Sequence, residues 1–309
     1  MLKSPIDYTL PAPPVLEKCI ESTEALLQEI HHAMTASFWQ DIDPAKIAEE
    51  GFNPFTNGAA LREPIFYGGE SAYSFQYRDF SPAKYANDDP WLIANKGFSI
   101  HDAHSVVFAV SRLQDEKAIS VMRAMSGTPQ ETWTFLPGNA FSVQEVADYG
   151  HIDPAIVDRV LSAFAVPPGA HNEQFKALHD FNIANANPLI RMPDGTFLLF
   201  HIYSLVEAVY EAPFCWMGAD KAYVSTAMQN RGVFTEQFAV ERLRQVFGAG
   251  NVLANIDIYE SKDTKLAEID VLVLFGNRAL VLQAKSKRLT LEARRGNDLQ
   301  IKDDFKKSI

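Results

Sequence analysis

The chain has 309 residues, 47% of them hydrophobic, and a formal net charge of −11. This length and hydrophobic content support a substantial core and favour two domains over one. The acidic balance excludes a protein that coats nucleic acid with its whole surface. Two cysteines, Cys19 and Cys215, are too few for a disulfide framework and lack the spacing of metal ligands.

Neither end of the chain nor its apolar segments predict export or membrane insertion. The N-terminal stretch MLKSPIDYTLPAPP lacks the apolar core of a signal peptide. No window has the run of apolar residues that a membrane span needs. We therefore expect a cytoplasmic protein without a membrane partner.

Charge is unevenly distributed along the chain. Residues 231–309 carry 14 Lys and Arg against 11 Asp and Glu, whereas the first 230 residues carry 14 against 28. The basic C-terminal part is therefore the candidate for nucleic-acid binding. The acidic N-terminal region is the candidate for a protein partner or for contact with a second copy of the chain.

The first 168 residues are predicted to form a mainly helical N-terminal domain. One helix follows Pro13 and Pro14, and a long helix begins after Ser99, which is an N-cap candidate with Asp102 three residues on. Between them, residues 50–98 are rich in Gly, Pro, Tyr and Phe, which predicts short strands and loops around an aromatic cluster.

Residues 141–166 read as two short helices joined by the turn GHIDP, a pattern that resembles a helix-turn-helix or winged-helix unit. A helix that reads DNA presents basic and amide side chains, and this one offers only Arg159 between acidic residues. A small helical packing module is therefore favoured over a transcription regulator. Residues 169–230 then predict a β-hairpin that turns at Asp194 and Gly195, followed by an apolar strand or helix.

The last part of the chain has the sharpest pattern. An amphipathic helix from Arg231 is followed by the strands NVLANIDIYE, EIDVLVLFG and RALVLQAKSK, and then by a polar helix that Asn297 or Asp298 caps. The expected fold class is therefore α+β overall, with a mainly helical N-terminal region followed by an α/β domain of order α-β-β-β-α at residues 231–309.

This order resembles the PD-(D/E)xK nuclease superfamily, most closely its Mrr and NERD branches, which share a restriction-endonuclease-like fold. The resemblance depends on Glu268-Ile269-Asp270 and on Gln283-Ala284-Lys285 on the next strand. Gln283 stands where most relatives have Glu, but several Mrr-type members also have Gln at this position. Glu236 on the first helix and Gln300 on the last helix match two further recurrent positions.

The resemblance implies a metal-dependent endonuclease that acts on DNA, in defence against foreign DNA or in repair. It implies a Mg²⁺ or Mn²⁺ ion held by Asp270, the side-chain oxygen of Gln283 and the backbone carbonyl of Ala284. Lys285 would orient or deprotonate the attacking water or hold the phosphate, and Glu236 would act as an outer ligand through water.

Elementary chemistry agrees with this expectation. Mg²⁺ is a hard ion that takes oxygen ligands and uses one or two carboxylates, and a bound metal lowers the pKa of an attacking water. Gln283 and Lys285 are two residues apart, so they share one face of an extended strand. The plainer alternative is that charged residues end apolar strands because strands end at the surface.

Basic residues after this motif are candidates for contacts with DNA phosphates, which carry no sequence information. Acidic residues alternate with the lysines of the last helix, so an ordinary solvated helix face is the alternative. The candidates are Lys287, Arg288, Arg294 and Arg295, with Lys302, Lys306 and Lys307 on the helix.

Two features keep a second function open. Gln283 has one negative charge fewer than a Glu, which allows a catalytically inactive member of the fold that binds nucleic acid or a protein. The superfamily core also continues with at least one further strand, whereas the sequence stops at Ile309. Either the core is truncated or a strand from the N-terminal region completes the sheet, and an unpaired edge would invite association.

Overall fold

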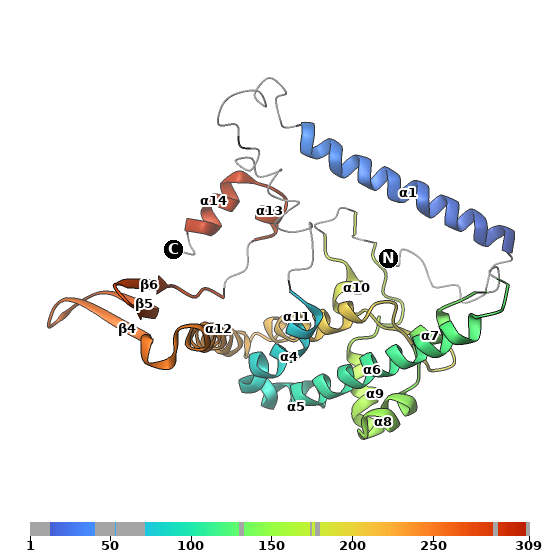
Figure 1. The fold of residues 1–309 in the computed structure, drawn as a ribbon, viewed down its shortest axis with the longest axis horizontal. Helices are drawn as coiled ribbons and strands as arrows, with labels where there is room; N and C mark the ends of the chain where they lie inside the picture. The colour runs from blue at the N-terminus through green and yellow to red at the C-terminus, as the bar shows by residue number, and fades with distance from the viewer. Residues whose placement is uncertain are drawn as a thin grey trace. The chain divides into compact units, whose positions relative to one another are not determined.

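The computed structural model describes residues 13–40, 53, 72–129, 133–173, 175–176, 180–286 and 290–306. Contacts divide the chain into two units, and Figure 1 labels the helices and strands of both. Residues 72–175 and 181–286 belong to one unit, whereas helix α1 and residues 290–306 belong to the other. This division differs from the expected domain boundaries near residues 168 and 230.

The first unit is mainly helical up to residue 247. Its helices before the first strand are α4 (Ser74–Tyr85), η3 (Ala86–Asp88), α5 (Asp89–Lys96), α6 (Ile100–Met125) and α7 (Leu136–Asn139). Later helices are α8 (Val143–Gly150), α9 (Pro154–Ala163), α10 (Ile183–Ala186), α11 (Ile202–Ala219) and α12 (Val224–Phe247). No helix among the described residues is both long enough and apolar enough to cross a membrane.

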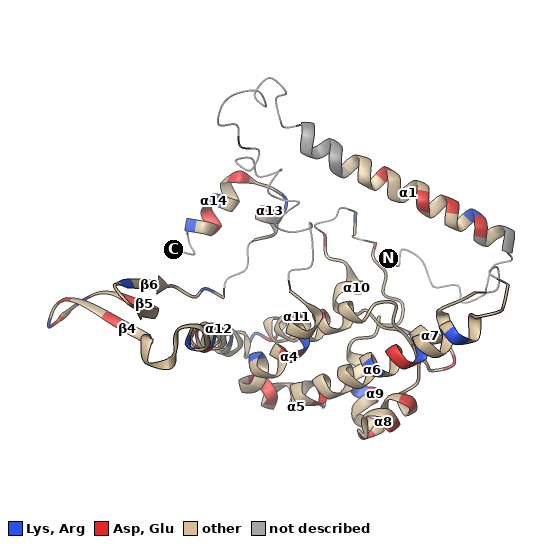
Figure 2. Cartoon of the chain, viewed as in Figure 1, with Lys and Arg blue, Asp and Glu red and all other residues tan. Residues whose placement is uncertain are grey.

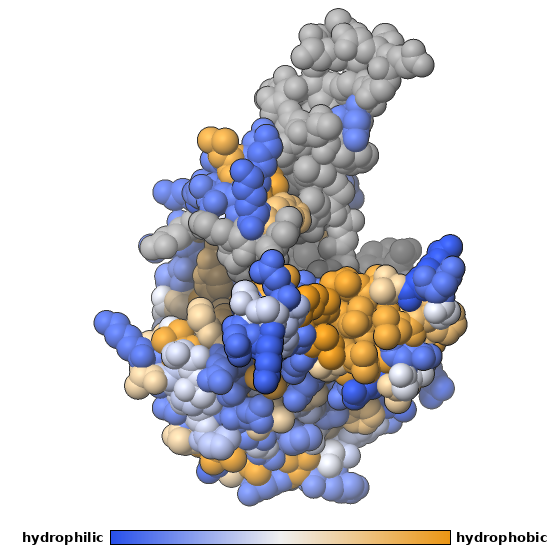
Figure 3. Space-filling model, turned by 90° about the vertical axis from the view of Figure 1, so that its left-hand side faces the viewer, coloured by the Kyte–Doolittle hydropathy of each residue, from blue (hydrophilic) through white to orange (hydrophobic). Residues whose placement is uncertain are grey.

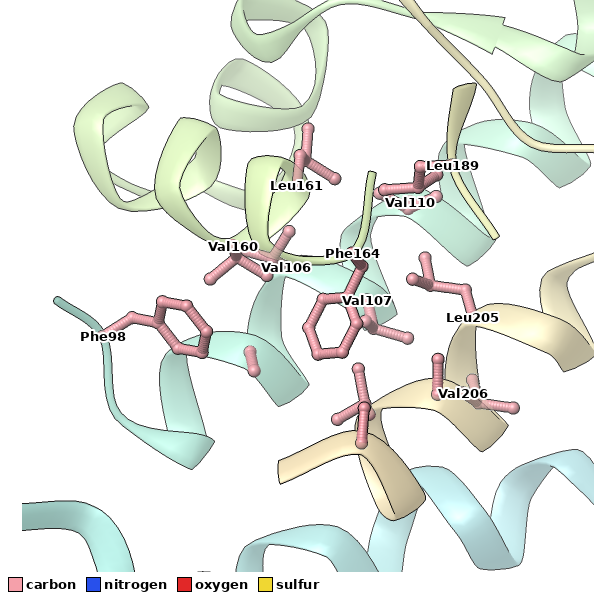
Figure 4. Packing of buried hydrophobic residues seen from close by; sticks show 14 of the residues in the cluster. Phe98, Val106, Val107, Val110, Val160, Leu161, Phe164, Leu189, Leu205 and Val206 are labelled. Carbon is pink, nitrogen blue, oxygen red and sulfur yellow. The ribbon is translucent and has the colours of Figure 1, made fainter. Parts of the chain in front are cut away.

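One hydrophobic core joins these helices. Phe164, which follows α9, is fully buried, and Figure 4 shows its ring beside Val107 of α6, with Leu205 and Val206 of α11 on the same side. Its ring also packs against Trp216 at a centroid distance of 5.3 Å. Segments that are far apart in sequence therefore meet at this side chain.

The prediction of strands and loops across residues 50–98 was wrong for the residues that the structure describes there beyond Ala72. They form α4, η3 and α5. Tyr77 and Tyr85 are buried in the core, and the hydroxyl of Tyr85 donates to the Tyr210 carbonyl at 2.7 Å. Packing against α11 thus overrides the β preference of the aromatic residues. Apart from Asn53, residues 50–71 lie outside the described part of the chain.

The predicted cap of the long helix is confirmed. The Asp102 N–H donates to the Ser99 hydroxyl at 3.1 Å, and the Asp102 carboxylate accepts from the Ser99 N–H at 2.8 Å. This reciprocal pair satisfies two backbone donors at the start of α6. The helix begins at Ile100 for this reason.

The helical pair predicted at residues 141–166 is present as α8 and α9, and a small sheet completes it. Strand β3 (Phe197–Leu198) pairs with both β1 (Ala140–Phe141) and β2 (Ile190–Arg191). The hairpin between β2 and β3 turns at Gly195 with φ of 85°, as expected. The order from α6 to β3 is therefore helix, strand, helical pair and hairpin, with the short helices α7 and α10 inserted.

Two arginines of this helix-and-sheet segment, Arg159 and Arg191, form contacts within the first unit. The Arg159 guanidinium donates to the Gly97 carbonyl at 3.1 Å. Arg191 pairs with Asp158 at 2.9 Å and donates to the Ser162 hydroxyl at 2.6 Å. Figure 2 shows acidic residues on α8. These contacts favour the packing module over a DNA-reading unit.

A buried carboxylate connects η3 to α12. Asp88 is 2% exposed, and its Oδ1 accepts from the Tyr223 hydroxyl at 2.8 Å and from the Asn230 amide at 2.7 Å. Burial raises the pKa of Asp88 above its ordinary value, and the hydrogen bonds from Asn230 and Tyr223 offset part of the rise. Burial and the contact with Asp88 raise the pKa of Tyr223 to about 12.

We expect Asp88→Asn to be neutral or stabilising at neutral pH. A carboxyl group whose pKa is raised by folding favours the folded state at low pH, and this contribution is lost as the pH rises through the folded pKa. The Asn oxygen can still accept both hydrogen bonds. Melting temperatures measured from about pH 4 to pH 7 should therefore show the variant gaining on the wild type as pH rises. A variant that loses stability relative to the wild type over that range would contradict the assignment.

The predicted α-β-β-β-α order of the C-terminal part is confirmed. Helix α12 is followed by η5 (Ala249–Asn251), β4 (Val252–Ser261), β5 (Thr264–Phe275) and β6 (Arg278–Leu282), which form an antiparallel sheet in the order β4-β5-β6. Helices α13 (Leu291–Arg294) and α14 (Asp298–Lys306) come next, in the second unit with α1 (Pro13–Gln40).

Candidate functional site

Helix α12 covers one face of the β4–β6 sheet. Val240 of this helix is clustered with Val252, Val271 and Val273, and Phe247 packs on Phe275 at 5.6 Å between ring centroids. Because Val252 pairs with Val273 and side chains alternate along each strand, residues 252, 254, 271 and 273 all point toward α12. We call this the inner face.

The other face, here called the outer face, carries the alternate residues. Leu272 lies on it between its cross-strand partners Leu253 and Val281. Leu253 is 41% exposed and Val281 is 57% exposed. Figure 3 looks onto this end of the molecule and shows apolar side chains gathered there.

Asp270 lies on the outer face of β5, two residues before Leu272. Val271 pairs with Leu282, so Asp270 is opposite Gln283, where β6 has just ended. Asp270 is 8% exposed. Its Oδ1 accepts from Nε2 of Gln283 at 2.8 Å, and its Oδ2 accepts from the Ala284 N–H at 2.7 Å. The structure thus joins three of the expected site residues.

The direction of these hydrogen bonds differs from the expected ligand arrangement. Gln283 and Ala284 were expected to offer their carbonyl oxygens to a metal, whereas in the structure they turn N–H groups toward Asp270. A carboxylate has about four lone-pair positions, so each oxygen of Asp270 keeps a position for another partner. Gln283 and Ala284 therefore fix the carboxylate from the β6 side.

Lys285 lies two residues beyond Gln283, in irregular backbone after β6, and its side chain is exposed. Because the strand has ended, alternation no longer fixes the side on which its ammonium group lies. The expected shared face of Gln283 and Lys285 is therefore not set by the sheet, although the two residues remain close in the chain.

Glu236 lies on α12 at the start of the stripe that packs on the sheet. It precedes Val240 by one helical turn and is half-buried. This stripe contacts the inner face, whereas Asp270 projects from the outer face. The register therefore does not support a direct role for Glu236 beside Asp270.

Glu268 is engaged elsewhere on the sheet. Its carboxylate pairs with Lys265 at 2.8 Å, and Lys265 also pairs with Asp257 at 2.6 Å. The hydrogen bonds to Asp257 and Glu268 raise the pKa of Lys265, and the Lys265 contact lowers the pKa of Asp257. Both carboxylates thus have a cation as partner.

The remaining expected residues belong to the second unit or lie outside the described residues. The side-chain oxygen Oδ1 of Asn297 accepts from the N–H groups of Leu299 and Gln300, so Asn297 is the cap of α14, and Gln300 itself is half-buried. Arg295 pairs with Glu292 and, at 3.7 Å, with Asp180. Lys287, Arg288, Lys307 and the Arg294 side chain are not among the parts described.

The donor set at Asp270 fits one kind of metal site and not another. Among the described residues, no group of three or more His, Cys, Asp or Glu side chains could hold a metal ion. A site of several acidic or imidazole ligands is therefore not present in that part of the chain. A single carboxylate with neutral oxygen donors and water is a set that Mg²⁺ accepts, and Asp270 supplies the carboxylate of such a set.

No protein-family model, curated protein or solved structure matches this chain.

Proposed function

We propose that this chain is a divalent-metal-dependent nuclease that hydrolyses DNA phosphodiester bonds at Asp270, in defence against foreign DNA or in repair. One observation carries the proposal. A buried carboxylate on the middle strand of an α-β-β-β-α segment accepts hydrogen bonds from Gln283 and Ala284, which come directly after the next strand, and Lys285 follows them. The resemblance of this segment to PD-(D/E)xK nucleases supports the same chemistry.

The residues divide the work as follows. Asp270, with carboxamide or backbone oxygens beside it, would hold Mg²⁺ or Mn²⁺. A bound ion supplies charge for the scissile phosphate and lowers the pKa of the attacking water. Gln283 and Ala284 hold the Asp270 carboxylate in place through their N–H groups. Lys285 supplies a flexible ammonium group that can orient that water or the phosphate.

Supercoiled plasmid incubated with the purified chain tests the proposal. Nicking is expected with Mg²⁺ or Mn²⁺, loss of nicking with excess EDTA, and recovery when Mn²⁺ is restored. A single-stranded DNA and an RNA of matched length, assayed in parallel, identify the class of nucleic acid. Cleavage that persists in EDTA, or the lack of any metal-dependent cleavage, would contradict the proposal.

A second candidate is a catalytically inactive module of the same fold that binds nucleic acid or a protein. The observation in its favour is that both oxygens of Asp270 already accept hydrogen bonds from N–H donors. In that case the Asp270 carboxylate has only a structural role, in which it accepts hydrogen bonds from the residues that follow β6. DNA retention in a gel-shift assay with Mn²⁺ present and no cleavage product would favour this candidate.

A further inference from the structure

Asn255 of β4 is the third polar residue of the row that contains Asp270 and Gln283. Ala254 pairs with Val271 and Ile256 pairs with Ile269, so Asn255 lies opposite Asp270 on the other side of β5. The burial along β4 alternates, with Asn255 exposed between the half-buried Ala254 and Ile256. The exposure of Asn255 between two half-buried neighbours places it on the outer face, the face that also carries Asp270.

The backbone of Asn255 is unusual for a strand. Its φ is 52°, in the left-handed region, and only one other non-glycine residue in the described chain, His151, has a positive φ. His151 ends a helix, where this conformation is ordinary. Within a strand the conformation costs about 1–3 kcal/mol and recurs at functional sites. Glycine adopts it at the lowest cost and Asn is one of the few other residues that adopt it readily, so Asn255 combines this backbone with a side-chain oxygen.

The hydrogen bonds of Asp270 indicate on which side of its carboxylate a further ligand would bind. Gln283 and Ala284 occupy the carboxylate from the β6 side. The other flank of the carboxylate faces β4, where the register places Asn255 opposite Asp270. An ion that binds Asp270 beside these N–H donors would approach on the Asn255 side.

We propose that Asn255 is a ligand of the divalent cation, with its side-chain oxygen and the Asp270 carboxylate forming the protein part of the site. This inference depends on the proposed metal-dependent function and replaces the expected oxygen ligands from Gln283 and Ala284. Hard divalent cations accept carboxylate and carboxamide oxygens and complete their shell with water. The ion then lies between β4 and β5.

Mn²⁺ binding by the purified chain, followed by the EPR signal of free Mn²⁺, tests the assignment without depending on cleavage. Asn255→Gly keeps the left-handed backbone and removes the oxygen. We expect this variant to bind Mn²⁺ about tenfold more weakly or worse, with a melting temperature no lower than that of the wild type. Asn255→Asp restores an oxygen ligand and adds charge, so it should bind at least as tightly as the wild type.

Asp257→Asn is the matched control, because it removes a carboxylate from the same strand and face while leaving Asn255 intact. Its Mn²⁺ affinity should remain within twofold of the wild type. Equal losses in Asp257→Asn and Asn255→Gly would indicate general attraction to acidic surface and overturn the inference. Unchanged affinity in Asn255→Gly, with binding by the wild type, would overturn the inference alone. A wild-type chain that binds no Mn²⁺ would overturn both this inference and the proposed function.

Discussion

Asp270→Ala is expected to remove metal-dependent DNA cleavage altogether. Asp270 is the only carboxylate in its cross-strand row, which it shares with two neutral amides, Asn255 and Gln283. Its loss removes the negative charge that would hold the cation, and without the cation the attacking water keeps an ordinary pKa. Plasmid nicking at saturating Mn²⁺ measures the effect, and Mn²⁺ binding should disappear with it.

The same substitution should also lower stability, which makes folding a necessary control. Asp270 accepts two hydrogen bonds, and a hydrogen bond to a charged group contributes about 1.5–3 kcal/mol to stability. Part of this loss is recovered when the freed N–H groups form hydrogen bonds with water. Gln283 is exposed, so its amide regains solvent easily. A urea titration will distinguish a folded, inactive variant from an unfolded one.

Lys285→Ala is expected to lower DNA cleavage without lowering the stability of the fold. The side chain is exposed, so the free energy of unfolding should change by less than about 0.5 kcal/mol. Cleavage should fall by about 10²–10⁴-fold if the ammonium group acts on the water or the phosphate. Arg278→Ala is the control, because it removes an exposed cation from the other end of β6. Cleavage that survives both Asp270→Ala and Lys285→Ala would remove the site assignment.

Regular alternation made the C-terminal sheet predictable. Apolar residues at every second position of β4 and the apolar runs of β5 and β6 defined three strands, and the turn at Gly276 and Asn277 joined the last two. The same rule predicted Asp270 and Gln283 on adjacent strands, and in the structure Gln283 directly follows the end of β6. What alternation could not give was the register, which decides that Asn255, and not a residue two places away, lies opposite Asp270.

Two expectations depended on packing that the sequence does not give. Ser74–Tyr85 was expected as strands and loops because its aromatic residues favour strands, yet burial of Tyr77 and Tyr85 against α11 makes it a helix. Glu236 was expected at the site because a Glu on the first helix recurs in the superfamily that this segment resembles, but the sequence does not say which face of the sheet that helix covers. The sequence does contain a signal for Asn255, because a polar residue of low strand propensity interrupts the apolar start of β4.

Phe164→Ala is expected to cause the largest loss of stability among these variants. The side chain is fully buried and contacts residues of α6 and α11, as Figure 4 shows. Its removal exchanges a packed ring for a cavity, which costs about 3–5 kcal/mol. Because a domain is stable by only about 5–15 kcal/mol, the variant should be close to unfolding. Urea denaturation followed by tryptophan fluorescence will measure the loss, since Trp216 lies 5.3 Å from the Phe164 ring.

Phe181→Ala provides the matched comparison, because it makes the same chemical change at a side chain that is 70% exposed. Its free energy of unfolding should stay within about 0.5 kcal/mol of the wild type. Phe164→Leu, which fills most of the volume, should fall between the two and keep enough folded protein to measure. If Phe164→Ala and Phe181→Ala unfold at the same urea concentration, then Phe164 does not join α6, α9 and α11. In that case the segment from α6 to α9 and helix α11 would have to be stabilised independently of each other.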